Sequence, residues 1–219
     1  MNSIKGLFVF TALFTLYTAQ AQKKVSELTL VYDITVATTG DKPEMAQMFN
    51  GATTTVYIKD NNHRTEDVTA LGQSVTIFNG KTGSAVVLKE YGSQKLLIRM
   101  TPDDWKSSNK QYEGITFTPG TETKTIAGYS CTQATGTMKD GTKFTVFYTK
   151  EIMPENKDYN AQFAALDGLV LEYSFTKNKM TVVRTVSQVK ESAIAPTKFE
   201  APKSGYREMT YAESKKGSR

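Results

Sequence analysis

Residues 127–173 read AGYSCTQATGTMKDGTKFTVFYTKEIMPENKDYNAQFAALDGLVLEY, and this stretch indicates the architecture of the whole chain. Asp140 and Gly141 stand between two runs rich in threonine, valine and aromatic residues. Because Asp-Gly tolerates positive φ at both central positions, we expect a hairpin with a type I′ turn there. In the strand that follows, Phe144, Val146 and Tyr148 alternate with other residues and form an apolar face. The stretch therefore predicts antiparallel sheet.

The second half of the stretch predicts a stop, a helix and a further strand. Pro154 should end the strand before it, because proline has no amide hydrogen to give to a ladder. Gly168 is placed to take the left-handed conformation that closes a helix. Residues 169–176 alternate again and predict a strand. The helix, of about three turns, is predicted by apolar residues at i, i+4 and i+7: Tyr159, Phe163 and Leu166.

The order of these features resembles the GLPGLI family of secreted proteins from Bacteroidetes-type bacteria, and a related family of unknown function with the same envelope location. The sequence departs from the family's name motif at Asp167, where the family has proline. Both families are similar in pattern to the periplasmic lipoprotein carriers (LolA/LolB-like), which are open antiparallel half-barrels with helices across the mouth. The resemblance implies a fold and a location, but no activity. The matching residues include Gly128, Tyr129, Cys131, Tyr148, Pro154, Gly168 and Leu169.

Residues 1–21 have the pattern of a targeting segment. Lys5 supplies the positive start, residues 7–16 are apolar, and an Ala-x-Ala cleavage signal ends at Ala21. We expect cleavage between Ala21 and Gln22. No later segment approaches the roughly 20 apolar residues that a transmembrane helix needs. The sequence therefore predicts an exported protein, periplasmic or extracellular.

Length and composition favour a single β-rich domain. Removing residues 1–21 leaves 198 of the 219 residues, which fits one domain over 22–202 and a polar tail over 203–219 that is expected to fray. The 28 threonines of the remaining chain suit a pleated surface. The net charge falls from +5 to +4 and is spread out, so we expect no nucleic-acid partner.

Alternating patterns on either side of the quoted stretch extend the sheet. The breaks between residues 54 and 100 are so short that the strands there must be antiparallel neighbours. Short helices are predicted from Asp41 to a stop at Gly51, and from a cap at Thr101 with Pro102 in the first turn. The fold class predicted is mainly β, a single-domain open antiparallel β half-barrel of about ten strands with two or three short helices over the concave face. The further strands predicted are 28–36, 54–59, 64–70, 74–78, 85–91, 95–100 and 180–189.

No catalytic constellation is visible in the sequence. His63, the only histidine, lies beside two asparagines and is expected to be an exposed loop residue. With one histidine and one cysteine the chain lacks a histidine or thiolate zinc site, and we expect no metal and no cofactor. Cys131 is expected to be a buried, inert thiol that forms no internal disulfide. Glu151 and Glu172 leave a carboxylate-dependent hydrolase as a minor alternative, although each is expected to face solvent.

The leading hypothesis is a non-enzymatic exported protein that binds a hydrophobic ligand, an acyl chain or a lipidated peptide, in the cell envelope. The alternative is a protein-interaction or assembly factor of the envelope with a closed core, in which the same apolar residues are plain core. A dry, fully packed interior would favour the alternative. The candidate ligand-contacting residues lie on one strand face or on the covering helices: Leu28, Leu30, Tyr32, Met45, Met48, Phe49, Trp105, Phe144, Val146, Phe163, Leu171, Tyr173 and Phe175.

Overall fold

The computed structural model describes residues 22–38, 49, 51–177 and 179–216. The targeting segment predicted at 1–21 and most of the helix predicted at 41–51 lie outside the described residues. The described helices are α2 (Pro102–Asn109), η1 (Lys110–Tyr112), η2 (Lys157–Tyr159), η3 (Pro196–Phe199) and α3 (Tyr211–Lys216). The strands are β1 (Lys23–Val25), β2 (Glu27–Thr38), β3 (Thr53–Lys59), β4 (Asn62–Thr69), β5 (Gly72–Asn79), β6 (Ser84–Tyr91), β7 (Gln94–Met100), β8 (Thr116–Ile126), β9 (Tyr129–Thr137), β10 (Lys143–Thr149), β11 (Ile152–Pro154), β12 (Leu169–Lys177), β13 (Met180–Lys190) and β14 (Arg207–Thr210).

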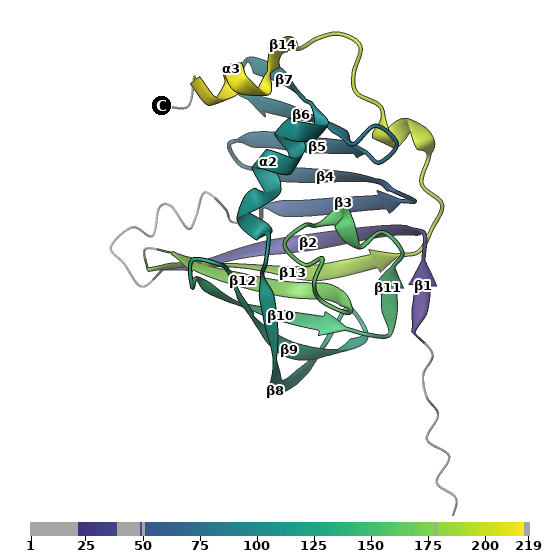
Figure 1. The fold of residues 1–219 in the computed structure, drawn as a ribbon, viewed down its shortest axis with the longest axis vertical. Helices are drawn as coiled ribbons and strands as arrows, with labels where there is room; N and C mark the ends of the chain where they lie inside the picture. Colours follow the sequence, from purple (N-terminus) through teal and green to yellow (C-terminus); the bar gives the residue numbers. More distant parts are fainter. Residues whose placement is uncertain (1–21, 39–48, 50, 178, 217–219) are drawn as a thin grey trace, which may run out of the picture.

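Twelve strands form one sheet in the order β14-β7-β6-β5-β4-β3-β2-β13-β12-β10-β9-β8. All neighbours are antiparallel except β14 and β7, and β14 and β8 remain as open edges. Figure 1 shows α2 lying across the strands β4 to β6, with β8 and β9 curving away at the other end. The prediction of an open, mainly antiparallel half-barrel is confirmed, with twelve strands in the sheet where about ten were expected.

Strands β2 to β7 follow the predicted pattern closely. Each strand pairs with the next along the chain. The chain then leaves the sheet through α2, where the Thr101 hydroxyl accepts the backbone N–H of Asp104 (3.2 Å) and the Asp104 carboxylate accepts the backbone N–H of Thr101 (3.0 Å). This reciprocal cap confirms the helix start predicted at Thr101.

The hairpin predicted at Asp140 and Gly141 exists as β9 and β10, but the type I′ turn lies in the preceding hairpin, between β8 and β9. Ala127 (φ 49°) and Gly128 (φ 88°) connect β8 to β9 with the two positive φ values that a type I′ turn requires. In the next hairpin only Gly141 has positive φ (83°), and its N–H donates to the Met138 carbonyl (2.9 Å). That connection is a short loop with glycine in the left-handed position, so the type I′ prediction at Asp140 was wrong.

The prediction of a helix around Tyr159–Leu166 was also wrong. The 3₁₀ turn η2 ends at Tyr159, and the residues after it form turns in which Phe163 N–H donates to Asn160 O and Leu166 N–H donates to Phe163 O. The three apolar side chains are nevertheless buried, so the apolar spacing reports burial against the sheet without α-helical backbone.

Gly168 does not close a helix either. A Cβ built there would lie 2.5 Å from the Thr149 carbonyl oxygen, so the residue allows two backbone segments to approach closely. Pro154 likewise has another role than predicted. The strand β10 already ends at Thr149, and Pro154 is the buried last residue of β11, which pairs in parallel with β1 in a separate two-stranded sheet.

Two buried clusters adjoin at β12. Leu171 is fully buried and belongs to a cluster with side chains of β2 and β3, whereas Val170 is fully buried in a second cluster with Phe144 and Phe163. Tyr173 of the same strand packs against both clusters, and its ring lies 5.0 Å from that of Phe163 between centroids, so the two clusters adjoin along β12.

The chain after β13 covers the face of strands β4 to β7 that is turned away from α2. Phe199 and Tyr206 pack against a cluster of β5, β6 and β7 side chains, and β14 extends the sheet beside β7. The Arg99 guanidinium donates two hydrogen bonds to the Glu208 carboxylate, both at 2.9 Å. Within the segment expected to fray, Tyr206 packs on this cluster, β14 joins the sheet and residues 211–216 form α3.

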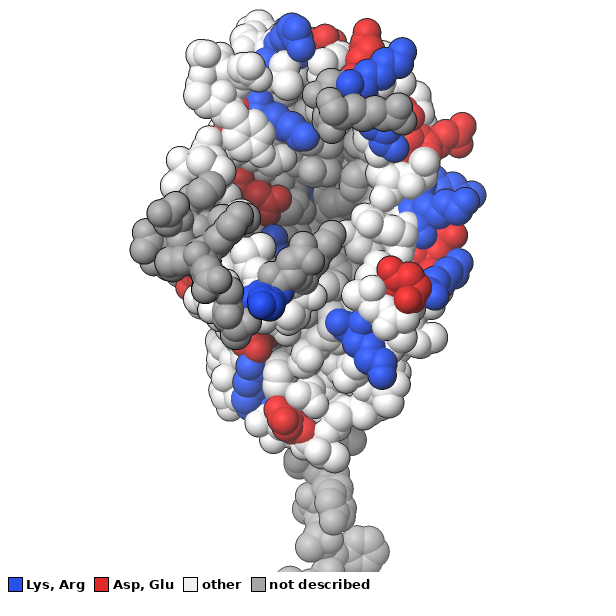
Figure 2. All heavy atoms as spheres, turned by 90° about the vertical axis from the view of Figure 1, so that its left-hand side faces the viewer, with Lys and Arg blue, Asp and Glu red and all other residues white. Residues whose placement is uncertain are grey.

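One face of the molecule is hollowed. Figure 2 shows the hollow on the side drawn at left in Figure 1, with basic and acidic side chains interspersed around it. In the part of the chain that the structure describes, no helix is long and apolar enough to span a bilayer.

Candidate functional site

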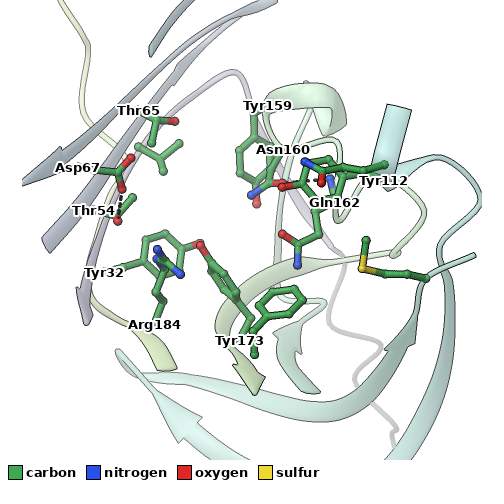
Figure 3. A pocket seen from close by; sticks show the side chains of 14 residues that line it. Tyr32, Thr54, Thr65, Asp67, Tyr112, Tyr159, Asn160, Gln162, Tyr173 and Arg184 are labelled. Carbon is green, nitrogen blue, oxygen red and sulfur yellow. Dashed lines mark hydrogen bonds between the residues drawn. The ribbon is translucent and has the colours of Figure 1, made fainter. Parts of the chain in front are cut away.

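A cavity of about 460 Å³ lies between the concave face of the sheet and the segment that follows β11. Strands β2, β3, β4, β12 and β13 supply one wall, and η1 with residues 159–162 supplies the other. Figure 3 shows Thr54, Thr65 and Asp67 on one side and Tyr112, Asn160 and Gln162 on the other. The volume is within the usual range for small-molecule sites.

The register of the sheet explains why these side chains share the cavity. Tyr32 lies opposite Thr54, and Thr54 lies opposite Asp67, so one row runs across β2, β3 and β4. Arg184 of β13 lies opposite Tyr173 of β12. Cross-strand partners point to the same face, so residues far apart in the sequence converge on one surface.

Aromatic rings make the apolar part of the cavity. The Tyr32 and Tyr173 rings meet edge to face at 5.8 Å between centroids, and the Phe163 and Tyr173 rings meet edge to face at 5.0 Å. The Tyr32 hydroxyl donates to the Val170 carbonyl oxygen (2.8 Å). Burial raises the pKa of Tyr173 to about 12 and that of Tyr32 well above its usual value, so both phenols are neutral near pH 7.

Polar groups are interspersed with the rings. The Thr54 hydroxyl donates to the Asp67 carboxylate at 2.6 Å. The Arg184 guanidinium lies 5.6 Å from the centroid of the Tyr173 ring, a distance at which a cation–π attraction operates. Gln162 is 7% exposed, and its Nε2 has no hydrogen-bond partner within the described ranges of the chain. The aromatic part of the cavity is therefore accompanied by the Asp67 carboxylate, the Arg184 guanidinium and the amide donor of Gln162.

The structure brings together only part of the residue set predicted from the sequence. Tyr32, Tyr173 and Phe175 line the cavity. Trp105 lies on α2 against Phe78 at 5.2 Å between ring centroids, and Phe49 is half-buried in a turn before β3. Met45 and Met48 lie outside the described residues. The remaining members are buried in the two core clusters: Leu28, Leu30, Leu171, Phe144, Val146 and Phe163.

Sequence reasoning missed the polar members of the cavity. Asp67 and Arg184 are charged residues within strand patterns, and each lies opposite a cavity residue of the neighbouring strand. A charge that interrupts an otherwise apolar strand face is the signal that could have identified Arg184, which lies among Val182, Val183 and Val186. Gln162 carried no such signal, because it is uncharged and its segment was predicted to be a helix and not a strand.

His63 was expected to be exposed, but it is 3% exposed on β4. Its ring stacks on Phe78 at 4.8 Å between centroids and lies 5.8 Å from the Trp105 ring. Burial lowers the pKa of His63 to about 4, and no described residue forms a hydrogen bond with its Nδ1. The prediction failed because His63 pairs with Ile58 and Phe78 on the inner face of the sheet, although the adjoining turn is polar.

Cys131 is buried as expected, and burial raises the pKa of its thiol to about 11. The two glutamates of the hydrolase alternative are held by other groups. Glu172 was expected to face solvent, but the structure shows it part-buried and hydrogen-bonded. It accepts hydrogen bonds from Lys124 Nζ (2.5 Å) and the Thr185 hydroxyl (2.9 Å). Glu151 accepts the backbone N–H of Ser130 (2.8 Å). Among the described residues, no group of three His, Cys, Asp or Glu side chains could hold a metal ion.

No protein-family model and no curated protein matches the chain. A solved structure of an uncharacterized conserved protein from Thermus thermophilus is similar over 87% of this chain and 92% of that one, at 9% identity and a TM-score of 0.50. A PNGF-II structure is similar over 87% of this chain at 14% identity and a TM-score of 0.48, and this chain spans about a third (32%) of its length. A LolA superfamily protein from Nitrosomonas europaea is similar over 83% of this chain and 91% of that one, at 11% identity and a TM-score of 0.33. At identities this low, structural similarity bears on the fold alone.

Proposed function

We propose that this chain is an exported, non-enzymatic protein that binds a hydrophobic ligand, an acyl chain or a lipidated peptide, in the cell envelope. The observation that carries the proposal is the cavity of about 460 Å³ on the concave face, with Tyr32, Tyr173 and Phe175 in its wall. The targeting pattern of residues 1–21 supports export, and the resemblance to lipoprotein carriers supports the ligand class.

The energetics of such a site are adequate without a charged contact. Burying ten methylenes would contribute about 8 kcal/mol at about 0.8 kcal/mol each. Lost translational and rotational freedom offsets part of this, so we expect micromolar binding for a chain of that length.

The alternative of an assembly factor with a closed core is less well supported. Its expected feature was a dry, packed interior, whereas the cavity is lined by polar and apolar side chains and is open on one side. The hydrolase alternative has weaker support, because the carboxylates of Glu151 and Glu172 already accept hydrogen bonds from neighbouring groups.

A cavity-filling variant tests the proposal. Thr65 lines the cavity and lies in β4, so Thr65→Trp should fill the space without removing core contacts. Leu171→Arg is unsuitable, because Leu171 is fully buried in the core and a charge there would report on folding. The matched control is Thr123→Trp, at an exposed position of β8.

The assay measures the fluorescence of N-phenyl-1-naphthylamine, a neutral apolar probe, with the chain from residue 22 onward. We expect binding by the wild type and the Thr123→Trp control, and a loss of about tenfold or more in Thr65→Trp. Binding that is unchanged in Thr65→Trp would mean that the probe occupies another place, and the proposal would fail.

A further inference from the structure

We infer that the cavity binds an amphiphile whose head group carries a single negative charge on oxygen, such as a carboxylate, and that Gln162 and Arg184 bind this head group. The inference rests on the proposed function, because it assigns the polar end of the same ligand. Figure 3 shows both side chains directed into the cavity from opposite elements, Gln162 from the segment after η2 and Arg184 from β13.

Gln162 provides the first argument. Gln162 lines the cavity with a side chain that is 7% exposed, and its Nε2 has no hydrogen-bond partner among the residues that the structure describes. A buried amide donor without a partner is destabilising, and most such groups in proteins find one. The Asn160 side chain accepts the backbone N–H of Gln162 (3.1 Å), which fixes the turn that presents this side chain. The missing partner is an acceptor oxygen inside the cavity.

Arg184 provides the second argument. Within the part of the chain that the structure describes, no carboxylate lies at ion-pair distance from its guanidinium, whereas Arg64 and Arg99 each have one. The guanidinium is held over the Tyr173 ring and lines the cavity. Its forked donors match the two oxygens of a carboxylate.

Asp67 limits the charge that the head group can carry. It lines the same cavity, and its carboxylate already accepts the Thr54 hydroxyl. One base and one acid leave room for a single negative charge near Arg184. A phosphate monoester, with about −1.5 to −2 charges near pH 7, would bring a second charge toward Asp67. A carboxylate is therefore favoured over a phosphate monoester of equal chain length.

Three ligands with the same alkyl chain test this assignment: dodecanoate, dodecyl phosphate and 1-dodecanol. Each is titrated against the N-phenyl-1-naphthylamine complex of the wild type, and displacement gives its affinity. We expect the affinity for dodecanoate to be at least about tenfold higher than that for 1-dodecanol, because the carboxylate accepts charge-assisted hydrogen bonds. We also expect dodecanoate to bind more tightly than dodecyl phosphate.

Two variants locate the preference. Gln162→Leu removes the amide donor at similar size, and Arg184→Met removes the charge and keeps an unbranched apolar stem. Each should lower the affinity for dodecanoate and leave that for 1-dodecanol within about threefold. Gln162→Glu, which replaces the donor by an acceptor, should weaken dodecanoate binding further. The controls are Gln188→Leu and Arg207→Met, both at exposed positions.

The outcomes separate this inference from the proposed function. If dodecanoate and 1-dodecanol bind equally and the variants change neither, the head-group assignment is overturned while the hydrophobic site stands. If dodecyl phosphate binds most tightly, the single-charge assignment is overturned. If none of the three ligands displaces the probe, the proposed function itself fails, and the head-group assignment fails with it.

Discussion

Replacing His63 by phenylalanine should remove much of the acid sensitivity of folding in this protein. His63 is the only histidine of the chain, so its titration is separable from that of the carboxylates. In the folded state its ring is buried against Phe78 and Trp105, and burial lowers its pKa to about 4. Phenylalanine keeps a flat ring of similar size at the same position and has no titrating group.

The sign follows from proton binding. In the unfolded chain His63 has its ordinary pKa of about 6.5, so between about pH 6.5 and pH 4 the unfolded state binds a proton that the folded state excludes. The stability contributed by the neutral ring is complete above about pH 6.5 and is lost as the pH falls toward 4. From the two pKa values, the loss between about pH 7.5 and pH 5 is about 2 kcal/mol.

Urea unfolding followed by the fluorescence of Trp105, the only tryptophan, measures this loss at both pH values. The wild type should lose about 2 kcal/mol more than His63→Phe on acidification. His63→Leu serves as a second variant if the larger ring does not fit. Equal losses in the wild type and in folded variants would show that His63 is not buried and neutral, and the account of this part of the concave face would be wrong.

Three further predictions concern the backbone and the thiol. Ala127→Gly should raise the free energy of unfolding by about 1 kcal/mol, because alanine is strained at the positive φ of the turn before Gly128; urea titration would contradict this if the variant were less stable. Gly168→Ala should lower that free energy by about 1–3 kcal/mol, since its Cβ would clash with the Thr149 carbonyl oxygen, and a neutral effect would argue against this close approach. The Cys131 thiol should react slowly with Ellman's reagent near pH 8 in the folded protein and rapidly after unfolding, and fast reaction of the folded protein would contradict its burial.

Strand positions could be predicted because alternation in this sequence is local. The strands β2, β3, β5, β6 and β7 each carry an apolar face, and the breaks between the strands contain glycine, asparagine or aspartate. The strand β4 is mostly polar, and the short breaks on either side of it indicated its place. The segment at 159–166 could not be assigned in the same way. Apolar spacing records which side chains are buried, and a series of tight turns against a sheet buries the same three residues as a helix would.

The candidate site was only partly predictable for a different reason. Tyr32 and Tyr173 stood out because they are aromatic and lie on apolar strand faces. Asp67 and Arg184 are 117 positions apart, and only the strand order β4-β3-β2-β13 brings them to one cavity. Leu28 and Leu171 were indistinguishable from cavity residues by pattern, because a core and a ligand site require the same kind of strand face.

Native mass spectrometry tests the central claim most directly. The protein is expressed in its source cells with residues 1–21 present, purified from the envelope fraction without detergent, and sprayed from a volatile buffer. The account predicts a chain with an added mass that organic solvent removes and that Thr65→Trp lacks. A bare mass equal to that of the chain in wild type and variant alike would contradict a ligand-filled cavity.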